Sequence, residues 1–260
     1  MDPVTGALAI KRFNPRKMLP HSVILMIAKR RSGKSVLVKD LMYYKRKELL
    51  TGVAMSCTEA GNGFYGQWVP DIFVYNDFDT DALQRLVDRQ KKLTRLDKVK
   101  PVFVILDDVG FDRKTLASKL MREIFLNGRH YKITLFICLQ YALDIPPALR
   151  SNIDYVCVLK ANQYRETLYK NFFSVVPNFA TFNSIMDSVT ENFGTLILDN
   201  TSHSSKLTEN IFWYRAKLER PFKLGTSEAW KFSKHRGKEE EDDIVPKKTE
   251  KKKIMVIKKI

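Results

Sequence analysis

The 260-residue chain is poor in cysteine, and its sequence contains no long apolar run. Its three cysteines, Cys57, Cys138 and Cys157, lack the spacing of metal ligands, and each falls in an apolar, strand-like segment. We expect reduced, buried thiols at all three positions. This usage is typical of a cytosolic protein and argues against a disulfide-stabilised secreted fold.

The sequence also lacks the usual signals for a membrane or secreted protein. No apolar run approaches the roughly 18 residues that a membrane-spanning helix needs. The stretch before Lys11 and Arg12 is too short for the apolar core of a signal peptide. We therefore expect no transmembrane segment and no secretory leader.

The chain also has few acidic residues relative to basic ones. Lys and Arg outnumber Asp and Glu by 45 to 29, which gives a net charge of +16, and the excess extends well beyond the C-terminal tail. Such a field favours nucleic acid or another anionic surface as a partner, although a basic protein without such a partner is the alternative. The 44% apolar content is enough to fill the core of one domain.

The first motif is a candidate phosphate-binding loop. An apolar run over 23–28 leads through a short loop into Gly33-Lys34-Ser35, at the start of an expected helix. In such a P-loop the glycine lets the backbone approach the phosphates, the lysine reaches the β- and γ-phosphates, and the hydroxyl ligates Mg²⁺. The free N–H groups of the helix favour the same anion. The residues expected to bind nucleotide are Ala28, Lys29, Arg30, Arg31, Ser32, Gly33, Lys34 and Ser35.

The loop departs from the G-x-x-x-x-G-K-[ST] pattern at one position, because Ala28 replaces the first glycine. Alanine can serve there only where the backbone conformation suits an L-residue. A nucleotide-gated DNA-binding or scaffold protein that has lost hydrolysis is the alternative that this substitution leaves open.

The second motif, Val102–Asp108, is an apolar run that ends in two carboxylates. An unbroken apolar run is typical of a strand buried on both faces of a parallel sheet, and ligands bind at the carboxyl ends of such strands. We expect Asp107 to hold Mg²⁺, directly or through water, and Asp108 to be the general base that activates water. The alternative is that both aspartates only cap the following turn.

Gln140 ends a third buried strand, expected over 133–140. An amide at this edge can hydrogen-bond both the γ-phosphate and the attacking water. In ring-forming motors, one whole strand lies between the carboxylate strand and the P-loop strand, and the strand ending at Gln140 is expected to take that place. Taken alone, Gln140 could equally be an ordinary polar residue at the end of a strand.

Strands and helices alternate along the chain. We predict strands at 23–28, 53–57, 102–107, 133–140, 155–160, 194–199 and 211–216, with 72–75 as a further candidate, and helices at 34–47, 79–96, 114–127, 163–173 and 178–191. Asp79 and Thr115 are expected to cap helices. The order predicts an α/β fold, a RecA-like (ASCE) P-loop NTPase domain with a central, mostly parallel sheet flanked by helices.

The expected organisation has four parts. Residues 1–20 form an N-terminal lead-in, residues 21–218 the ATPase core, and residues 219–233 a segment packed on or near that core. Residues 234–260 form a tail with blocks of like charge, which is typical of disorder.

Together, Ala28–Ser35, Val102–Asp108 and Asn127–Ile133 leading to Gln140 resemble the FtsK/HerA superfamily of DNA-pumping ATPases. Within it, the pattern is most similar to the poxvirus-type packaging ATPases of large nucleocytoplasmic DNA viruses, over roughly residues 20–200. The resemblance implies that ATP and Mg²⁺ drive double-stranded DNA into a preformed capsid. It also implies a homo-oligomeric ring of roughly five or six subunits and a capsid or membrane-vertex partner. The expected location is the host cytoplasm, at sites of viral assembly, with the virion as an open alternative. Lys247–Lys253 is expected to be a solvated end of the chain, and a nuclear import signal or a DNA-binding tail are the alternatives.

Such rings need an arginine donated to a neighbour's nucleotide, where its charge stabilises the transferring phosphoryl group. The resemblance favours Arg129, which precedes Gln140 at the spacing that FtsK-like sequences show. Arg150 and Arg165 are the alternatives, and a surface role is the default for any of the three.

DNA contacts should go to phosphates, because packaging proceeds over any sequence. The candidates are Lys91 and Lys92 with Arg95, the Arg113-Lys114 turn, and an expected mobile loop, Thr58–Gln67, whose Phe64 and Tyr65 we expect to pack. Two other classes remain: another DNA-dependent P-loop ATPase, and a P-loop kinase of a nucleotide or metabolite that needs no DNA.

Overall fold

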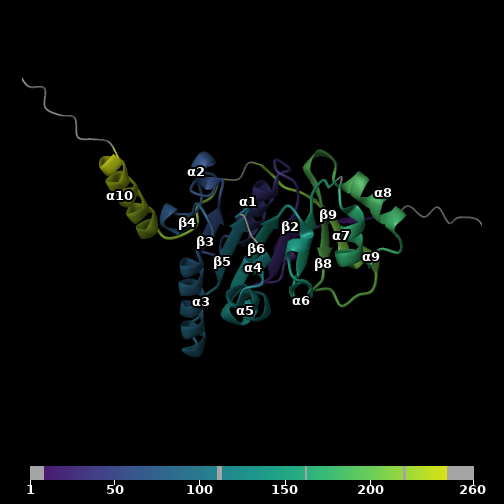
Figure 1. Cartoon of the computed structure of the whole chain (residues 1–260), viewed down its shortest axis with the longest axis horizontal. Coiled ribbons are helices and arrows are strands. Elements are labelled where there is room, and N and C mark those ends of the chain that lie inside the picture. The colour runs from purple at the N-terminus through teal and green to yellow at the C-terminus, as the bar shows by residue number, and fades with distance from the viewer. Residues whose placement is uncertain (1–8, 110–112, 162, 219–220, 245–260) are drawn as a thin grey trace, which may run out of the picture.

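A nine-stranded sheet forms the centre of the computed structural model, which describes residues 9–109, 113–161, 163–218 and 221–244 (Figure 1). The strand order is β1-β9-β8-β7-β2-β6-β5-β3-β4. Strand β8 runs antiparallel to β7 and β9, and the other neighbours are parallel, which confirms the mostly parallel α/β sheet. The strands are β1 Lys11–Arg12, β2 Val23–Ile27, β3 Thr51–Ser56, β4 Val74–Tyr75, β5 Val102–Asp107, β6 Ile133–Leu139, β7 Tyr155–Val158, β8 Gly194–Asp199 and β9 Ile211–Arg215.

The middle of the sheet has the arrangement that the motifs predict. Strand β6 lies between β2 and β5, so one whole strand separates the P-loop strand from the carboxylate strand. The three strands are parallel and in register, with Ile27 opposite Leu139 and Asp107 opposite Cys138. Their carboxyl ends therefore meet at one edge of the sheet, which is where parallel α/β sheets bind ligands.

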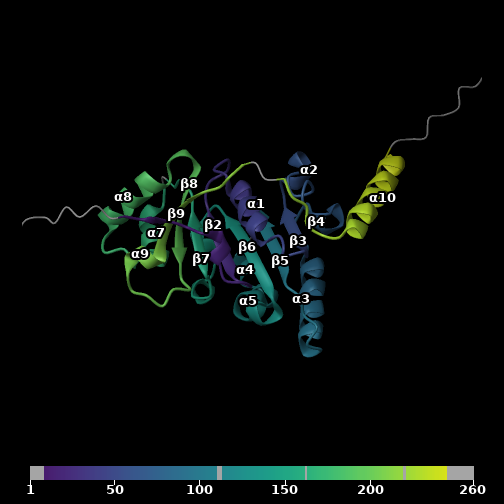
Figure 2. The same ribbon diagram turned by 180° about the vertical axis from the view of Figure 1, so that it is seen from behind.

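Helices cover both faces of the sheet (Figures 1 and 2). Helix α1 packs on one face, with Leu37 and Leu41 in one buried cluster with Phe103 and Ile105 of β5. Helices α3, α5, α7 and α8 pack on the other face. Both faces can be covered in this way because successive residues of a strand point to opposite sides of the sheet, and the strands carry apolar residues on both sides. The helices are α1 Lys34–Lys45, α2 Glu59–Asn62, α3 Thr80–Arg95, α4 Arg113–Leu116, α5 Lys119–Asn127, α6 Pro147–Arg150, α7 Arg165–Phe172, α8 Phe179–Val189, α9 Leu207–Asn210 and α10 Ser227–Ile244.

One predicted helix cap is correct and one is wrong. Asp79 accepts a hydrogen bond of 2.8 Å from Ala82 N and so caps α3. The helix predicted over 114–127 is divided into α4 and α5, and Ser118, not Thr115, caps α5 by accepting from Met121 N. The division follows from the side chain of Ser118, which bonds the backbone of a new first turn.

The two ends of the chain differ most from expectation. Strand β1, inside the expected lead-in, pairs with β9. At the other end, α10 crosses the predicted boundary at residue 234, so the beginning of the expected disordered tail is helical. This stretch is rich in Lys and Glu, which are good helix formers. Ser233 anchors the helix by accepting a hydrogen bond from Ile72 N. The rest of the tail, 245–260, lies outside the described residues.

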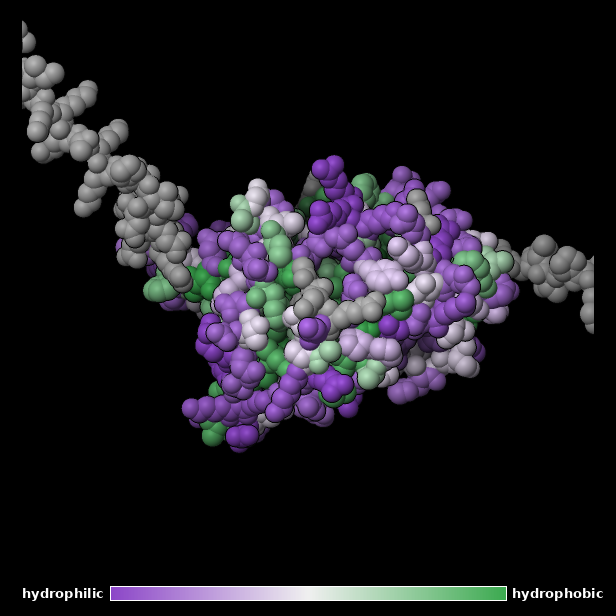
Figure 3. Space-filling model, viewed as in Figure 1, coloured by the Kyte–Doolittle hydropathy of each residue, from purple (hydrophilic) through white to green (hydrophobic). Residues whose placement is uncertain are grey.

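Hydrophilic side chains cover most of the face seen in Figure 3, with small hydrophobic areas between them. Within the described part of the chain, no helix is both long enough and apolar enough to cross a bilayer. Cys138 and Cys157 are buried as expected, but Cys57 is exposed, because β3 ends one residue before it, at Ser56.

Candidate nucleotide-binding site

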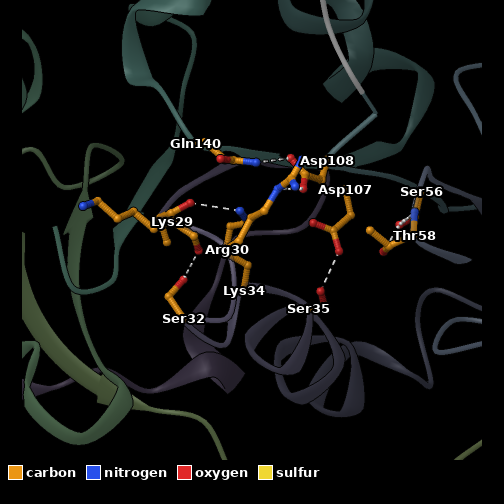
Figure 4. Close-up of polar contacts among 11 residues, drawn as sticks. Lys29, Arg30, Ser32, Lys34, Ser35, Ser56, Thr58, Asp107, Asp108 and Gln140 are labelled. Carbon is orange, nitrogen blue, oxygen red and sulfur yellow. Dashed lines mark hydrogen bonds and ion pairs between the residues drawn. The ribbon is translucent and has the colours of Figure 1, made fainter. Parts of the chain in front are cut away.

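The P-loop connects β2 to α1 at the carboxyl edge of the sheet (Figure 4). Gly33 has φ of +95°, a conformation that favours glycine, and it directly precedes the first residue of α1. No side chain caps α1 at Gly33. The first N–H groups of this helix are therefore available to a phosphate, as the sequence predicts.

Ala28 fits the position of the missing glycine without strain. Its N–H donates to Leu139 O at 3.1 Å, which continues the β2–β6 pairing by one residue. Among the described residues of the loop, only Arg31 and Gly33 have positive φ. Because Ala28 keeps an ordinary backbone, its methyl group removes no conformation that the loop needs. The substitution therefore gives no reason to expect lost hydrolysis.

Lys34 is buried at the base of the loop, and its ammonium group donates to Ala28 O at 2.9 Å. Ser32 closes the other side of the loop through a bond from its hydroxyl to Lys29 O. The lysine thus lies inside the ring of backbone that would surround a phosphate, where its charge is needed.

Ser35 and Asp107 meet as the two motifs predict. The Ser35 hydroxyl donates to Asp107 Oδ2 at 2.6 Å, across the gap between α1 and β5. A hydroxyl and a carboxylate side by side are the protein's usual share of a magnesium site, since Mg²⁺ takes its other ligands from phosphate and water. In the described part of the chain, no group of three or more His, Cys, Asp or Glu side chains is placed to hold a metal ion.

Asp108 and Gln140 form the second contact between motifs. Gln140 Nε2 donates to Asp108 Oδ1 at 2.7 Å, which joins the ends of β5 and β6. Arg30, with a side chain 80% exposed, lies 3.7 Å from Asp108 Oδ2. Asp108 has φ of +53°, an uncommon conformation that aspartate tolerates and that often occurs at functional sites. Its side chain accordingly faces Gln140 and the P-loop.

Tyr65 is a site residue that sequence reasoning missed. Its packing was expected, and the side chain is indeed 1% exposed, but its hydroxyl also donates to Asp107 Oδ2 at 2.7 Å. Glu59 holds the loop in place by accepting from Tyr65 N and Gly66 N at 2.9 and 2.8 Å. Burial raises the pKa of Tyr65 well above its ordinary value, so the phenol remains a donor. No spacing rule signals this contact, because it is made between distant segments.

Arg129 lies at the opposite edge of the sheet from the P-loop. It belongs to a 3₁₀ turn, Gly128–Tyr131, that precedes β6, whereas Gln140 follows β6. The intervening strand corresponds to roughly 23 Å. The exposed side chain of Arg129 therefore cannot reach the nucleotide site of its own chain.

Arg150 and Arg165, the alternatives, are engaged within the chain. Arg150 donates to Ile145 O and to Asn171, and its burial lowers its pKa. Arg165 donates to Ala161 O and pairs with Asp187 at 2.6 Å, which ties α7 to α8. Both pairs of contacts fit a structural role.

The candidate DNA contacts differ in how far their side chains are engaged within the chain. Lys91 forms an ion pair of 2.5 Å with Glu123 of α5, so part of its charge is neutralised within the chain. The expected mobile loop contains the short helix α2 and is held by Glu59. The side chain of Arg113 lies outside the described residues.

A cavity of about 580 Å³ opens between the P-loop, the end of β6 and the start of α7. Its wall includes Gln140 beside the P-loop, and an edge-to-face pair, Tyr141 and Tyr164, whose ring centroids are 4.9 Å apart. The site is therefore open to a reactant beside the P-loop and Gln140.

The fold and the site define a P-loop ATPase domain of the RecA-like type. The chain belongs to the family of the poxvirus A32 protein, whose sequence model matches residues 10–210. Uncharacterized protein 088R of Invertebrate iridescent virus 3 is 34% identical over 213 residues, covering 80% of this chain and 82% of its own length. Uncharacterized protein L437 of Acanthamoeba polyphaga mimivirus is 32% identical over 232 residues, covering 84% and 81%.

Solved structures support the fold. The genome packaging NTPase B204 from Sulfolobus turreted icosahedral virus 2, in complex with AMP, superimposes with a TM-score of 0.58 at 16% identity, covering 77% of this chain and all of that one. Its complex with ATP-gammaS gives a TM-score of 0.54 at 17% identity, covering 76% and 98%. At this identity the likeness extends to the fold alone.

Proposed function

We propose that this chain is a DNA-packaging ATPase, a motor that hydrolyses ATP to move double-stranded viral DNA into a capsid. The observation that carries the proposal is the meeting of Ser35 with Asp107 and of Gln140 with Asp108 at one edge of the sheet. Membership of the poxvirus A32 protein family supports the viral setting, and B204, which shares the fold, is described as a genome packaging NTPase.

The residues divide the chemistry of hydrolysis between them. Lys34 and the backbone of the P-loop hold the β- and γ-phosphates, and Ser35 with Asp107 would hold Mg²⁺, which neutralises phosphate charge when bound. Asp108 accepts a proton from the water whose oxygen attacks the γ-phosphorus, as the bond to the bridging oxygen of ADP breaks. Gln140, already bonded to Asp108, orients that water.

We further propose that the motor works as a closed ring and that Arg129 acts on the neighbouring subunit's nucleotide. Arg129 is exposed and lies at the edge opposite the P-loop, so any contact that it makes with a nucleotide has to be with that of another subunit. A guanidinium delivered in this way stabilises charge on the transferring phosphoryl group.

Double-stranded DNA is the proposed partner inside the ring. The net charge of +16 supports binding to phosphates, which requires no base sequence. A capsid or membrane-vertex protein is the proposed anchor, and we place the motor in the host cytoplasm where virions assemble.

Two substitutions and a matched control test the proposed ATP hydrolysis. Lys34→Ala should abolish ATP binding, because the phosphates lose their cation, whereas Asp108→Asn should bind ATP normally and fail to release phosphate. Asp81→Asn, the same change at an exposed position on α3, is the matched control and should behave as wild type. Undiminished phosphate release by Asp108→Asn would remove Asp108 as the base.

A further inference from the structure

A second cavity, of about 330 Å³, flanks the P-loop on the side away from the carboxylates. Part of its wall is the loop itself, from Lys29 to Ser32. The rest comes from Lys160, just after β7, and from Thr190, Asn192 and Phe193, in the turn before β8. The function derived above uses none of these last four residues.

The position of this cavity follows from the strand order. Strand β2 has β6 on one side and β7 on the other. The groups that would act on the γ-phosphate, Asp108 and Gln140, follow β5 and β6. A nucleotide bound to the P-loop would have its γ-phosphate on the side of β5 and β6, next to Asp108 and Gln140. Its sugar and base would then extend to the other side of the loop, toward β7 and β8, where the second cavity lies.

Phe193 presents a flat apolar surface at this place. The residue is 68% exposed, which is unusual for a phenylalanine beside a charged loop. Its ring is next to the P-loop, because a Cβ built on Gly33 would lie 3.6 Å from Phe193 Cδ1. The ring therefore stands immediately beside the start of α1, and most of its surface is free.

The backbone holds the ring outward. Asn192 and Phe193 both have positive φ, at +49° and +61°, which is uncommon for two adjacent residues other than glycine. The next residue fixes the turn, since a Cβ on Gly194 would lie 1.9 Å from Val189 O, so only glycine fits there. Such conformations persist where the surroundings impose them, often at ligand sites.

We propose that Phe193 is the base-stacking platform of the nucleotide site, with Lys160 and Asn192 beside the sugar and base. The inference rests on the proposed ATPase function and adds the part of the substrate that the P-loop does not touch. Stacking suits any nucleobase, because every base has a π-face. Stacking on Phe193 would therefore make a nucleoside triphosphate bind more tightly than an inorganic polyphosphate, which has no base.

The test compares the binding of ATP and of inorganic tripolyphosphate, both with Mg²⁺, by calorimetry. Phe193→Ala should weaken ATP binding about tenfold, the order expected for loss of one stacked base, and should leave tripolyphosphate binding unchanged. Phe193→Trp should retain ATP affinity. Phe232→Ala, at another exposed phenylalanine on α10, is the matched control and should change neither ligand.

The outcomes separate this proposal from the function on which it rests. If Phe193→Ala binds ATP as wild type does, or loses both ligands equally, the platform is wrong while the ATPase stands. If wild type binds neither ligand, or if Lys34→Ala binds both normally, the nucleotide site itself is wrong and the platform with it.

Discussion

Tyr65 donates a hydrogen bond of 2.7 Å to Asp107 Oδ2, the same oxygen that receives the hydroxyl of Ser35. The carboxylate of Asp107 is therefore oriented from two sides, by the P-loop helix and by the loop that Glu59 stabilises. An arrangement of this kind fixes a metal ligand before the metal binds, and it links the loop at 59–66 to the hydrolytic site.

Tyr65→Phe should keep the packing of the ring and remove this bond. The expected result is about a tenfold higher Mg²⁺ concentration for half-maximal ATP hydrolysis, the usual scale for losing a group that orients a metal ligand. A magnesium titration of phosphate release measures the change, with Tyr75→Phe as the control. An unchanged titration would mean that the hydroxyl only satisfies a buried polar group.

Gln140→Ala should lower kcat by about a hundredfold with little change in KM, since one donor that acts in the transition state is lost. Gln140→Glu should act differently, because it places a second carboxylate against Asp108. Two carboxylates this close repel each other, and Asp108 also loses its hydrogen-bond donor, so this variant should release phosphate more slowly than Gln140→Ala does. Phosphate release by Gln140→Glu as fast as that of wild type would argue against the contact between Gln140 and the base.

Arg129→Ala should abolish ATP hydrolysis if the arginine serves a neighbour, and so should Lys34→Ala. Mixing the two variants should restore part of the activity, because some P-loops with an intact lysine then face an intact arginine. Phosphate release by mixtures of varied ratio measures the recovery, and Arg122→Ala, an exposed arginine on α5, is the control. Failure of every mixture would contradict the exchange between subunits.

Asp154 gives the fold a pH dependence. It accepts a hydrogen bond of 2.7 Å from Val23 N, and burial raises its pKa above the ordinary value. The folded state therefore keeps the proton to higher pH than the unfolded state does. This group's contribution to stability is largest below the unfolded pKa and falls as pH rises through the folded pKa.

Asp154→Asn retains an oxygen for Val23 N and removes the titration. The difference between the urea midpoint of the variant and that of wild type should thus increase in favour of the variant as pH rises from about 4 to about 7, the range above the ordinary pKa of aspartate. Asp88→Asn, at an exposed position on α3, should show no such gain. A gain that is absent, or reversed in sign, would show that the buried carboxylate does not control this range.

The sequence predicts the central strands well, because β2, β5 and β6 are buried on both faces and leave unbroken apolar runs. Their parallel pairing then dictates that Ser35, Asp107, Asp108 and Gln140 converge. Strand β1 cannot be predicted from the sequence, because it consists of two exposed residues whose pairing with β9 is set by tertiary contacts.

Tyr65 and Phe193 could not be assigned from the sequence for a related reason. Each reaches the P-loop region from a loop elsewhere in the chain, and only the folded backbone brings it there. Local patterns report which face of an element is buried, but not which distant segments meet.

The most direct test of the motor is ATP hydrolysis by the purified chain with and without long double-stranded DNA, across a salt series. Asp108→Asn supplies the blank. We expect DNA to accelerate phosphate release and the acceleration to fade as salt rises, because contacts with phosphates release counterions. Hydrolysis that is indifferent to DNA at every salt concentration would contradict a DNA-packaging ATPase.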